Sequence, residues 1–141
     1  MKVAIEVGTD ALSCKLFESL SDCLVGHEVI LVSPTTERAL VDVVEALKPS
    51  ICIGISFGSG NGITSGTETF YTTGAAGGSA QRIHEAVLEV LGIRDRGVTA
   101  LEASSYIPIV RTQLGYSDSM VDMVVVASNL RELAKAIVSA I

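Results

Sequence analysis

The sequence predicts an α/β domain in three layers, with a mostly parallel central sheet and helices on both of its faces. Short apolar runs alternate along the chain with stretches in which apolar residues recur every three or four positions. The first pattern is typical of buried strands and the second of amphipathic helices. The length of 141 residues fits one domain, so we treat residues 1–141 as a single domain.

The first half of the chain predicts three strands and two helices. The strands are residues 2–7, 28–32 and 51–56. The third strand is apolar on both faces and is therefore expected to be central in the sheet. The first helix follows from the helical spacing of apolar residues from Leu12 to Leu24 and ends at Gly26. The second is predicted to be capped by Thr36 and stopped by Pro49.

The second half of the chain predicts three more strands and two more helices. The strands are residues 67–71, 107–110 and 121–127. One helix is predicted to begin at a capping Ser79 and to end at Gly92. The last helix is predicted to begin with a capping box formed by Asn129 and Glu132.

Composition excludes several classes of protein. The formal net charge is −6, and charged residues make up 18% of the chain against 48% apolar residues. An acidic chain is unsuited to nucleic acid and to anionic membrane surfaces, and a chain so rich in apolar residues is not disordered. With few charges and a mean hydropathy of +0.49, some apolar surface is expected to remain exposed, which favours a homo-oligomer.

Cysteine usage and the start of the chain bear on the compartment. The three cysteines, Cys14, Cys23 and Cys52, are an odd and sparse set, which suits a reducing compartment better than a disulfide framework. Met1 and Lys2 lead directly into the first predicted strand, so no secretory signal is predicted. We therefore expect a cytoplasmic protein, which could be exported by another route.

A glycine-rich segment follows the predicted central strand. Eight of the 13 glycines lie between Gly54 and Gly78. Because ligands of open α/β sheets bind beyond the carboxyl ends of the strands, this segment is the expected site. Residues 58–62 lack the spacing of nucleotide-binding glycine motifs, which favours a glycine-rich turn. The Gly-x-Ser-x-Gly pattern around Ser56 leaves a serine hydrolase open as a minor alternative, with His84 as its base.

The residue types that bind metals are scattered along the sequence. Cys14 and Cys23 are nine positions apart in the first predicted helix, which places them on opposite sides of it, so they and His27 are not a convincing zinc set. The carboxylates that could supply oxygen ligands are Glu6, Asp10, Glu18 and Glu68. Their spacing does not require a metal.

Three segments carry a resemblance to a known family. They are Ser65-Gly66-Thr67-Glu68-Thr69-Phe70-Tyr71, Leu91-Gly92-Ile93-Arg94-Asp95-Arg96-Gly97-Val98 and Ala127-Ser128-Asn129-Leu130-Arg131-Glu132-Leu133. In this order they resemble the zinc-dependent N-acetylmuramoyl-L-alanine amidases, which cut the lactyl-amide bond between glycan and stem peptide in bacterial cell walls. Residues 1–10, 26–29 and 51–61 are compatible with the same family, so the resemblance spans nearly the whole chain.

The resemblance also implies losses. It places the two zinc-binding histidines and the catalytic glutamate of the family at Thr9, Ser56 and Met123. The segment that holds the family's glutamate ligand is missing, and the nearest carboxylates are Asp10 and Glu18. Hydroxyl groups are poor neutral zinc ligands beside imidazole, and a thioether cannot act as a general base. The resemblance thus implies the fold of the family without its zinc chemistry.

Three functions follow from these observations. The first is a non-catalytic relative of cell-wall amidases, without a cofactor, that acts as a binding, assembly or regulatory protein. It would bind a peptidoglycan fragment or a protein partner, with Asn61, Glu68 and Arg94 as candidate ligand-binding residues. The second is an active peptidoglycan amidase, which a phage could encode, with zinc in a rearranged site formed by Asp10, Glu18 or Glu68. The third is the serine hydrolase centred on Ser56.

Overall fold

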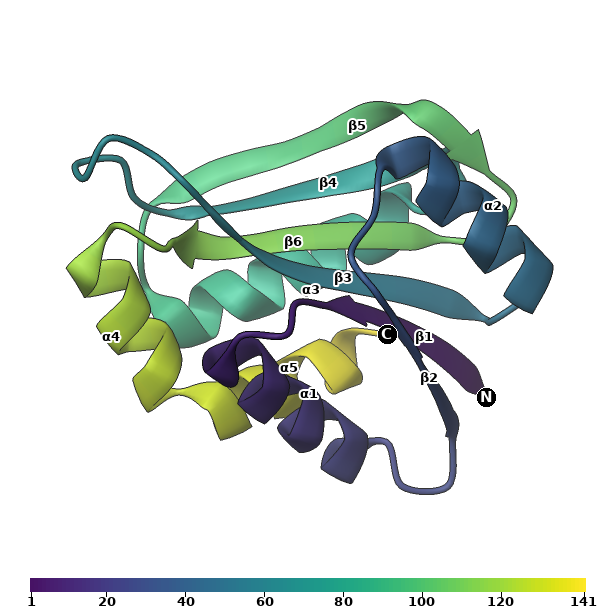
Figure 1. The fold of residues 1–141 in the computed structure, drawn as a ribbon, viewed down its shortest axis with the longest axis horizontal. Helices are drawn as coiled ribbons and strands as arrows, with labels where there is room; N and C mark the ends of the chain where they lie inside the picture. Colours follow the sequence, from purple (N-terminus) through teal and green to yellow (C-terminus); the bar gives the residue numbers. More distant parts are fainter.

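The protein consists of one six-stranded sheet and five helices, seen in a computed structural model that describes residues 1–141 (Figure 1). The elements in chain order are β1 (Lys2–Val7), α1 (Ala11–Cys23), β2 (Glu28–Val32), α2 (Glu37–Leu47), β3 (Ile51–Gly58), β4 (Thr67–Gly74), α3 (Gly77–Leu91), β5 (Asp95–Ser105), β6 (Ile109–Tyr116), α4 (Met120–Ser128) and α5 (Leu130–Ala140). The strand order is β2-β1-β3-β6-β4-β5. All neighbouring strands are parallel except β4 and β6, which are antiparallel.

Helices cover both faces of this sheet, which confirms the predicted α/β class. On one face, Leu40 and Val44 of α2 pack on the row formed by Ala4, Cys52 and Ile109. On the other face, α1, α3 and α5 contribute to the larger hydrophobic core, and α5 packs against both other helices (Figure 1). None of the helices has both the length and the apolar character needed to cross a membrane.

Several predicted helix ends are confirmed. The hydroxyl of Thr36 accepts a hydrogen bond from the amide of Ala39 and caps α2. Gly92 ends α3 in the left-handed conformation, with φ of 61°, which glycine adopts without steric cost. Asp10 was not predicted as a cap, yet its carboxylate accepts a hydrogen bond from the amide of Ser13 at the start of α1.

The prediction of a strand at residues 121–127 is wrong, because this segment forms α4. Ser119 caps the helix by accepting a hydrogen bond from the amide of Asp122. The buried carboxylate of Asp122 accepts two more hydrogen bonds, from the amides of Tyr116 and Gly66. Three hydrogen bonds thus fix the first turn as helix and override the strand preference of the valine-rich run.

Other boundaries also differ from the predictions. The strand predicted at residues 107–110 is β6, which runs on to Tyr116, and β5 was not predicted. Helix α3 begins after Ala76, two residues before Ser79, with no side-chain cap. Asn129 forms no capping box, because its amide group donates to the carbonyl oxygen of Val125 instead.

Candidate functional site

A polar surface lies on the sheet face that carries α2. Helix α2 packs on the row Ala4, Cys52 and Ile109 and against β5, and the next rows toward the carboxyl ends of the parallel strands hold polar side chains. Alternate residues of a strand share a face. The first of these rows holds Glu6, Gly54 and Arg111 side by side. The second holds Ser56 beside Gln113, and Glu68 of β4 lies opposite Gln113.

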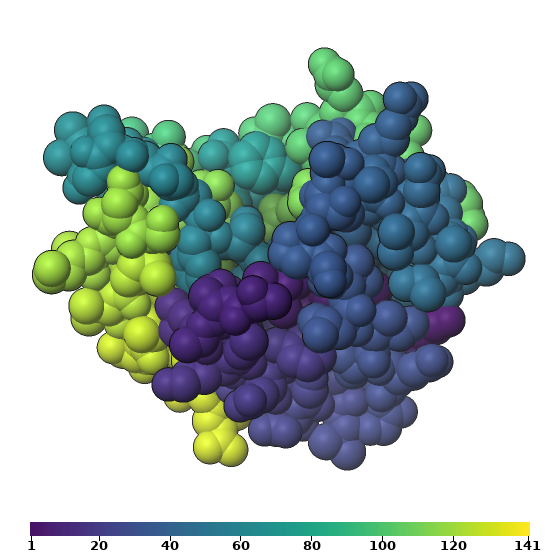
Figure 2. Space-filling view, viewed as in Figure 1, coloured from purple at the N-terminus to yellow at the C-terminus, as the bar shows by residue number.

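We call this surface the polar groove and define it by Glu6, Ser56, Glu68, Arg111 and Gln113. Figure 2 looks onto this face, which is hollowed between α2 and the loop that follows β3. The groove lies at the carboxyl ends of β1 and β3, where ligands of open α/β sheets bind. This agrees with the site predicted from the glycine-rich segment.

An ion pair crosses three strands at the base of the polar groove. Arg111 on β6 donates from Nε to Oε1 of Glu6 on β1 (3.0 Å) and from Nη2 to Oε2 (2.9 Å). The Arg111 Nη2 group also donates to the carbonyl oxygen of Thr35 (2.9 Å), while the amide of Thr35 donates to Glu6 (3.2 Å). Every oxygen of the buried Glu6 carboxylate is therefore engaged, as such a charge requires.

Gly54 on β3 makes this crossing possible. A Cβ atom at this position would lie 2.7 Å from Glu6 Oε1 and 3.0 Å from Arg111 Cγ. Any side chain here would therefore push the guanidinium and the carboxylate apart. The absence of a side chain at Gly54 lets Arg111 lie across the central strand and reach its partner.

Cys52 is buried beside this pair. Burial raises the pKa of its thiol to about 12, and the Glu6 carboxylate adds to this effect while Arg111 opposes it. A thiol with such a pKa stays protonated at neutral pH and is a poor nucleophile and metal ligand. Cys52 is thus a small apolar core residue.

A cavity of about 200 Å³ adjoins the ion pair. It is lined by Glu6, Gly8, Asp10, Ser13, Pro34, Ile55, Ser56, Phe57 and Arg111. Burial alone would raise the pKa of Asp10, but hydrogen bonds from Ser13 outweigh burial and hold the pKa of this carboxyl below its ordinary value. Asp10 is therefore negatively charged at neutral pH.

Of the three positions that the resemblance assigned to the catalytic centre, Ser56 alone lines the cavity. Ser56 lies in the polar groove and is exposed, whereas Thr9 is exposed in the turn after β1 and does not line the cavity. Met123 lies on α4 and lines a separate surface depression with Met120 and Val124. The residue beside Ser56 is Gln113.

Sequence reasoning missed Gln113 and Arg111 because it ended the strand at residue 110. The alternation that reveals them is present in the sequence. Val110, Thr112 and Leu114 are buried, while Arg111 and Gln113 between them are partly exposed. A longer strand at this point would have placed both polar side chains on one face.

The candidate ligand-binding residues are dispersed. Glu68 lies in the polar groove, and Arg94 is exposed just before the edge strand β5. The carboxamide oxygen of Asn61 is occupied within its own loop, where it accepts hydrogen bonds from the amides of Ile63 (3.1 Å) and Thr64 (3.0 Å). Asp118 braces the same loop through the amides at positions 60 and 62.

Ser56 and His84 lie on opposite faces of the sheet. Ser56 is in register with Gln113, so it faces the polar groove, whereas Thr112, the preceding residue of β6, faces α3. On that side Thr112 lies 3.2 Å from the Thr69 hydroxyl, which lies 2.8 Å from His84 Nδ1. The structure thus does not bring together the serine and the base of a serine hydrolase.

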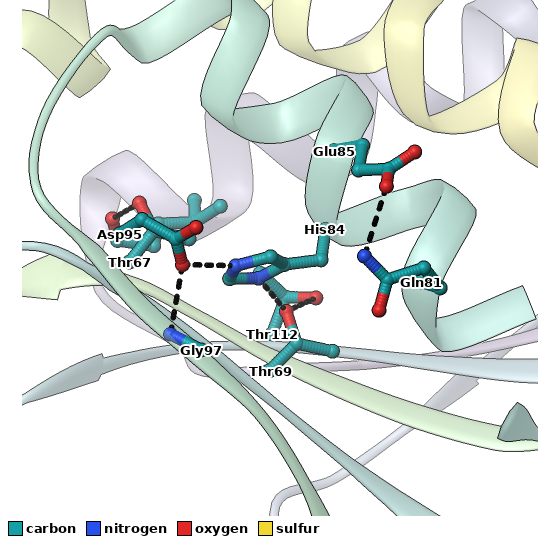
Figure 3. A network of polar contacts seen from close by, with 9 residues as sticks. Thr67, Thr69, Gln81, His84, Glu85, Asp95, Gly97 and Thr112 are labelled. Atoms are coloured by element: carbon teal, nitrogen blue, oxygen red, sulfur yellow. Dashed lines mark hydrogen bonds and ion pairs between the residues drawn. The ribbon is translucent and has the colours of Figure 1, made fainter.

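His84 is instead the centre of a buried polar network (Figure 3). Its Nε2 atom lies 2.8 Å from the Oδ1 atom of Asp95, which also accepts a hydrogen bond from the amide of Gly97. The hydrogen bond to His84, with that from Gly97, holds the pKa of Asp95 below its ordinary value. The network joins α3 to the start of β5.

The Asp95→Asn variant is expected to be less stable than the wild type at neutral pH, because asparagine keeps the acceptor oxygen but loses the charge. Since the pKa of Asp95 is lowered by folding, its contribution is present above its ordinary pKa of 3.8 and is lost as the pH falls through the lower folded-state value. Urea unfolding from neutral pH to about pH 3 measures this. A difference in the free energy of unfolding between wild type and variant that stays constant over that pH range would contradict the prediction.

The residue types that bind metals do not cluster in the polar groove. No group of three or more His, Cys, Asp or Glu side chains lies close enough together to hold a metal ion. Glu18 is exposed on α1, and Nδ1 of His27 lies 2.8 Å from the amino group of Met1. The Glu6 carboxylate is paired with Arg111.

The surface of α4 exposes apolar side chains. Met120, Val121 and Val124 are exposed there, and Ile63 is exposed in the loop that Asp118 braces. This is the apolar surface that the composition predicted. Self-association and a cytoplasmic location stay predictions.

Comparison with known proteins gives structural likeness alone. No family model matches the sequence, and no curated protein matches it. The catalytic domain of CwlV, an N-acetylmuramoyl-L-alanine amidase from Bacillus (Paenibacillus) polymyxa var. colistinus, superposes with a TM-score of 0.81 at 21% identity, over 99% of this chain and 94% of that one.

Two further solved structures agree. The amidase AmiC2 of Nostoc punctiforme gives a TM-score of 0.78 at 17% identity, over 99% of this chain and 94% of its own. The N-acetylmuramoyl-L-alanine amidase of Clostridium difficile 630 gives 0.79 at 14% identity, over 99% and 93%. The chain therefore has the fold of N-acetylmuramoyl-L-alanine amidase catalytic domains over nearly its whole length, which confirms the fold that the resemblance implied.

Proposed function

We propose that this domain is a non-catalytic relative of cell-wall amidases that binds a fragment of peptidoglycan in the polar groove. The observation that carries the proposal is the pair Ser56 and Gln113, which lie side by side on the groove floor of an amidase fold. A hydroxyl and a carboxamide donate and accept hydrogen bonds. They suit the hydroxyl and amide groups of a glycan with a peptide attached.

The same residues do not fit a zinc hydrolase. Zinc in such enzymes takes nitrogen, sulfur or carboxylate ligands, and a base is needed to activate water. Of the carboxylates near the cavity, Glu6 is paired with Arg111 and Asp10 caps α1. Neither Ser56 nor Gln113 can act as a base at neutral pH. Glu68 also lies in the groove, but a single carboxylate does not make a zinc site, so these residues suit the binding of a polar ligand better than its cleavage.

The competing function is an active peptidoglycan amidase with a rearranged metal site. It would need carboxylates such as Asp10, Glu18 or Glu68 as ligands. Glu68 lies in the polar groove, while Glu18 lies on the exposed side of α1. The two functions differ in zinc content and in cleavage, so one set of measurements separates them.

Titration with N-acetylmuramoyl-L-alanyl-D-isoglutamine, followed by NMR, tests the proposal. We expect saturable binding with shifts at the polar groove, no cleavage of the lactyl-amide bond by mass spectrometry, and no zinc retained after loading and desalting. The Gln113→Ala variant should weaken binding by about fivefold to tenfold, because a buried hydrogen bond contributes about 1 kcal/mol. Gln81→Ala, on the exposed side of α3, is the matched control and should bind like the wild type.

Two outcomes would overturn the proposal. The first is retention of about one zinc per chain together with cleavage, which would establish the amidase alternative. The second is the absence of saturable binding at millimolar concentrations of the ligand, at which even a weak site would be filled.

A further inference from the structure

The Arg111 guanidinium has two N–H groups that are not used by the protein. A guanidinium carries five N–H donors, one on Nε and two on each terminal nitrogen. Nε donates to Glu6, and Nη2 donates to Glu6 and to the carbonyl oxygen of Thr35. These three bonds leave both N–H groups of Nη1, and Arg111 lines the cavity beside the groove with 27% of its side chain exposed.

The guanidinium is also held in place before any ligand arrives. Glu6 fixes it through two parallel hydrogen bonds, Thr35 fixes it through a third, and Gly54 leaves the only path across β3. Binding to such a fixed group loses little side-chain freedom. The free N–H groups of Nη1 can each donate a charge-assisted hydrogen bond to a carboxylate oxygen.

We infer that Arg111 supplies the cation of this site and that the cavity beside it binds a carboxylate group of the ligand. This inference rests on the proposed function, since it names the part of the ligand that the groove recognises. The volume of about 200 Å³ corresponds to about six or seven waters. It therefore admits a carboxylate on a short side chain or at the end of a peptide.

Asp10 carries the charge opposite to that of Arg111, which allows a second test of the inference. Its carboxylate lines the same cavity and is negatively charged at neutral pH. Removal of this charge should tighten the binding of an anion, while removal of Arg111 should weaken it. Serine is a suitable replacement for Asp10, because it also caps helices.

Two ligands that differ only in charge test the inference. N-acetyl-L-alanine carries a carboxylate, and N-acetyl-L-alaninamide carries a neutral amide of nearly the same shape. We expect the acid to bind about tenfold more tightly than the amide, which corresponds to about 1.4 kcal/mol. The preference for the acid over the amide should decrease as salt is added. The Asp10→Ser substitution should increase this preference severalfold.

The variants separate a specific contact from general charge. Glu6→Gln with Arg111→Gln removes both charges together and should abolish the preference for the acid. Arg111→Lys keeps the charge beside Glu6, loses the fork, and should reduce the preference even if the double variant fails to fold. Arg131→Gln, exposed on α5, makes the same change in net charge as Arg111→Gln and should leave the preference unchanged.

The inference and the proposed function can fail separately. Equal binding of the acid and the amide would overturn the carboxylate site. A loss of preference in Arg131→Gln as large as that in the Arg111 variants would also overturn it. In either case, binding of the muramoyl peptide would still stand. Absence of muramoyl peptide binding with a retained preference for the acid would overturn the proposed function and leave Arg111 as a carboxylate site of another ligand.

Discussion

Replacement of Arg111 by leucine is expected to lower the free energy of unfolding by about 3–5 kcal/mol, because it leaves a buried carboxylate without its counter-charge. Glu6 is 4% exposed and would keep only the hydrogen bond from the amide of Thr35. Leucine is apolar and shorter than arginine, so the substitution removes the guanidinium and leaves an apolar side chain on β6. Urea unfolding at neutral pH, monitored by circular dichroism, measures the effect.

The double variant Glu6→Leu with Arg111→Leu is the control for this prediction. It removes both charges at once, and replacement of a buried ion pair by apolar side chains is often neutral or stabilising. We therefore expect the double variant to be clearly more stable than Arg111→Leu alone. If the single variant lost less than about 1 kcal/mol, the pair would behave as a solvated surface contact.

The first two strands could be predicted from local pattern, but the ion pair that organises the groove could not. The ranges of β1 and β2 were predicted to the residue, because each is a short apolar run with a clear stop. Glu6 and Arg111 are 105 positions apart. Their meeting depends on the strand order, in which β3 separates β1 from β6, and no local signal encodes that order.

The surroundings of Met123 also depend on distant contacts. Val121 to Ala127 resembles a strand in composition, but Asp122 within it accepts hydrogen bonds from the distant Gly66 and the nearby Tyr116. These contacts and the cap at Ser119 make the segment a helix. The position that the resemblance assigned to Met123, by its distance from Asn129, therefore lies on α4. The groove position beside Ser56 is held by Gln113, on a strand whose second half was not predicted.

Replacement of His84 by alanine is expected to lower the free energy of unfolding by about 2–4 kcal/mol. The ring is 2% exposed, so its removal leaves a cavity between α3 and the sheet. The substitution also removes His84 Nδ1, which lies 2.8 Å from the Thr69 hydroxyl. This hydroxyl is fully buried and would keep only Thr112 as a hydrogen-bond partner. An unsatisfied buried hydroxyl adds to the cost of the cavity. Thermal or urea unfolding at neutral pH measures the sum.

Two further variants help to separate the causes of the stability loss in His84→Ala, which are the cavity and the unsatisfied hydroxyl. Thr69→Val together with Thr112→Val in the His84→Ala background removes both buried hydroxyls that would lack a partner and nearly keeps the volume, so this variant should recover the polar part of the loss and leave the cavity part. Glu85→Ala changes the next residue of α3, which is exposed and bonds only Gln81, and should cost less than about 0.5 kcal/mol. A loss of that same small size at His84→Ala would mean that the network of Figure 3 does not hold α3 to the sheet.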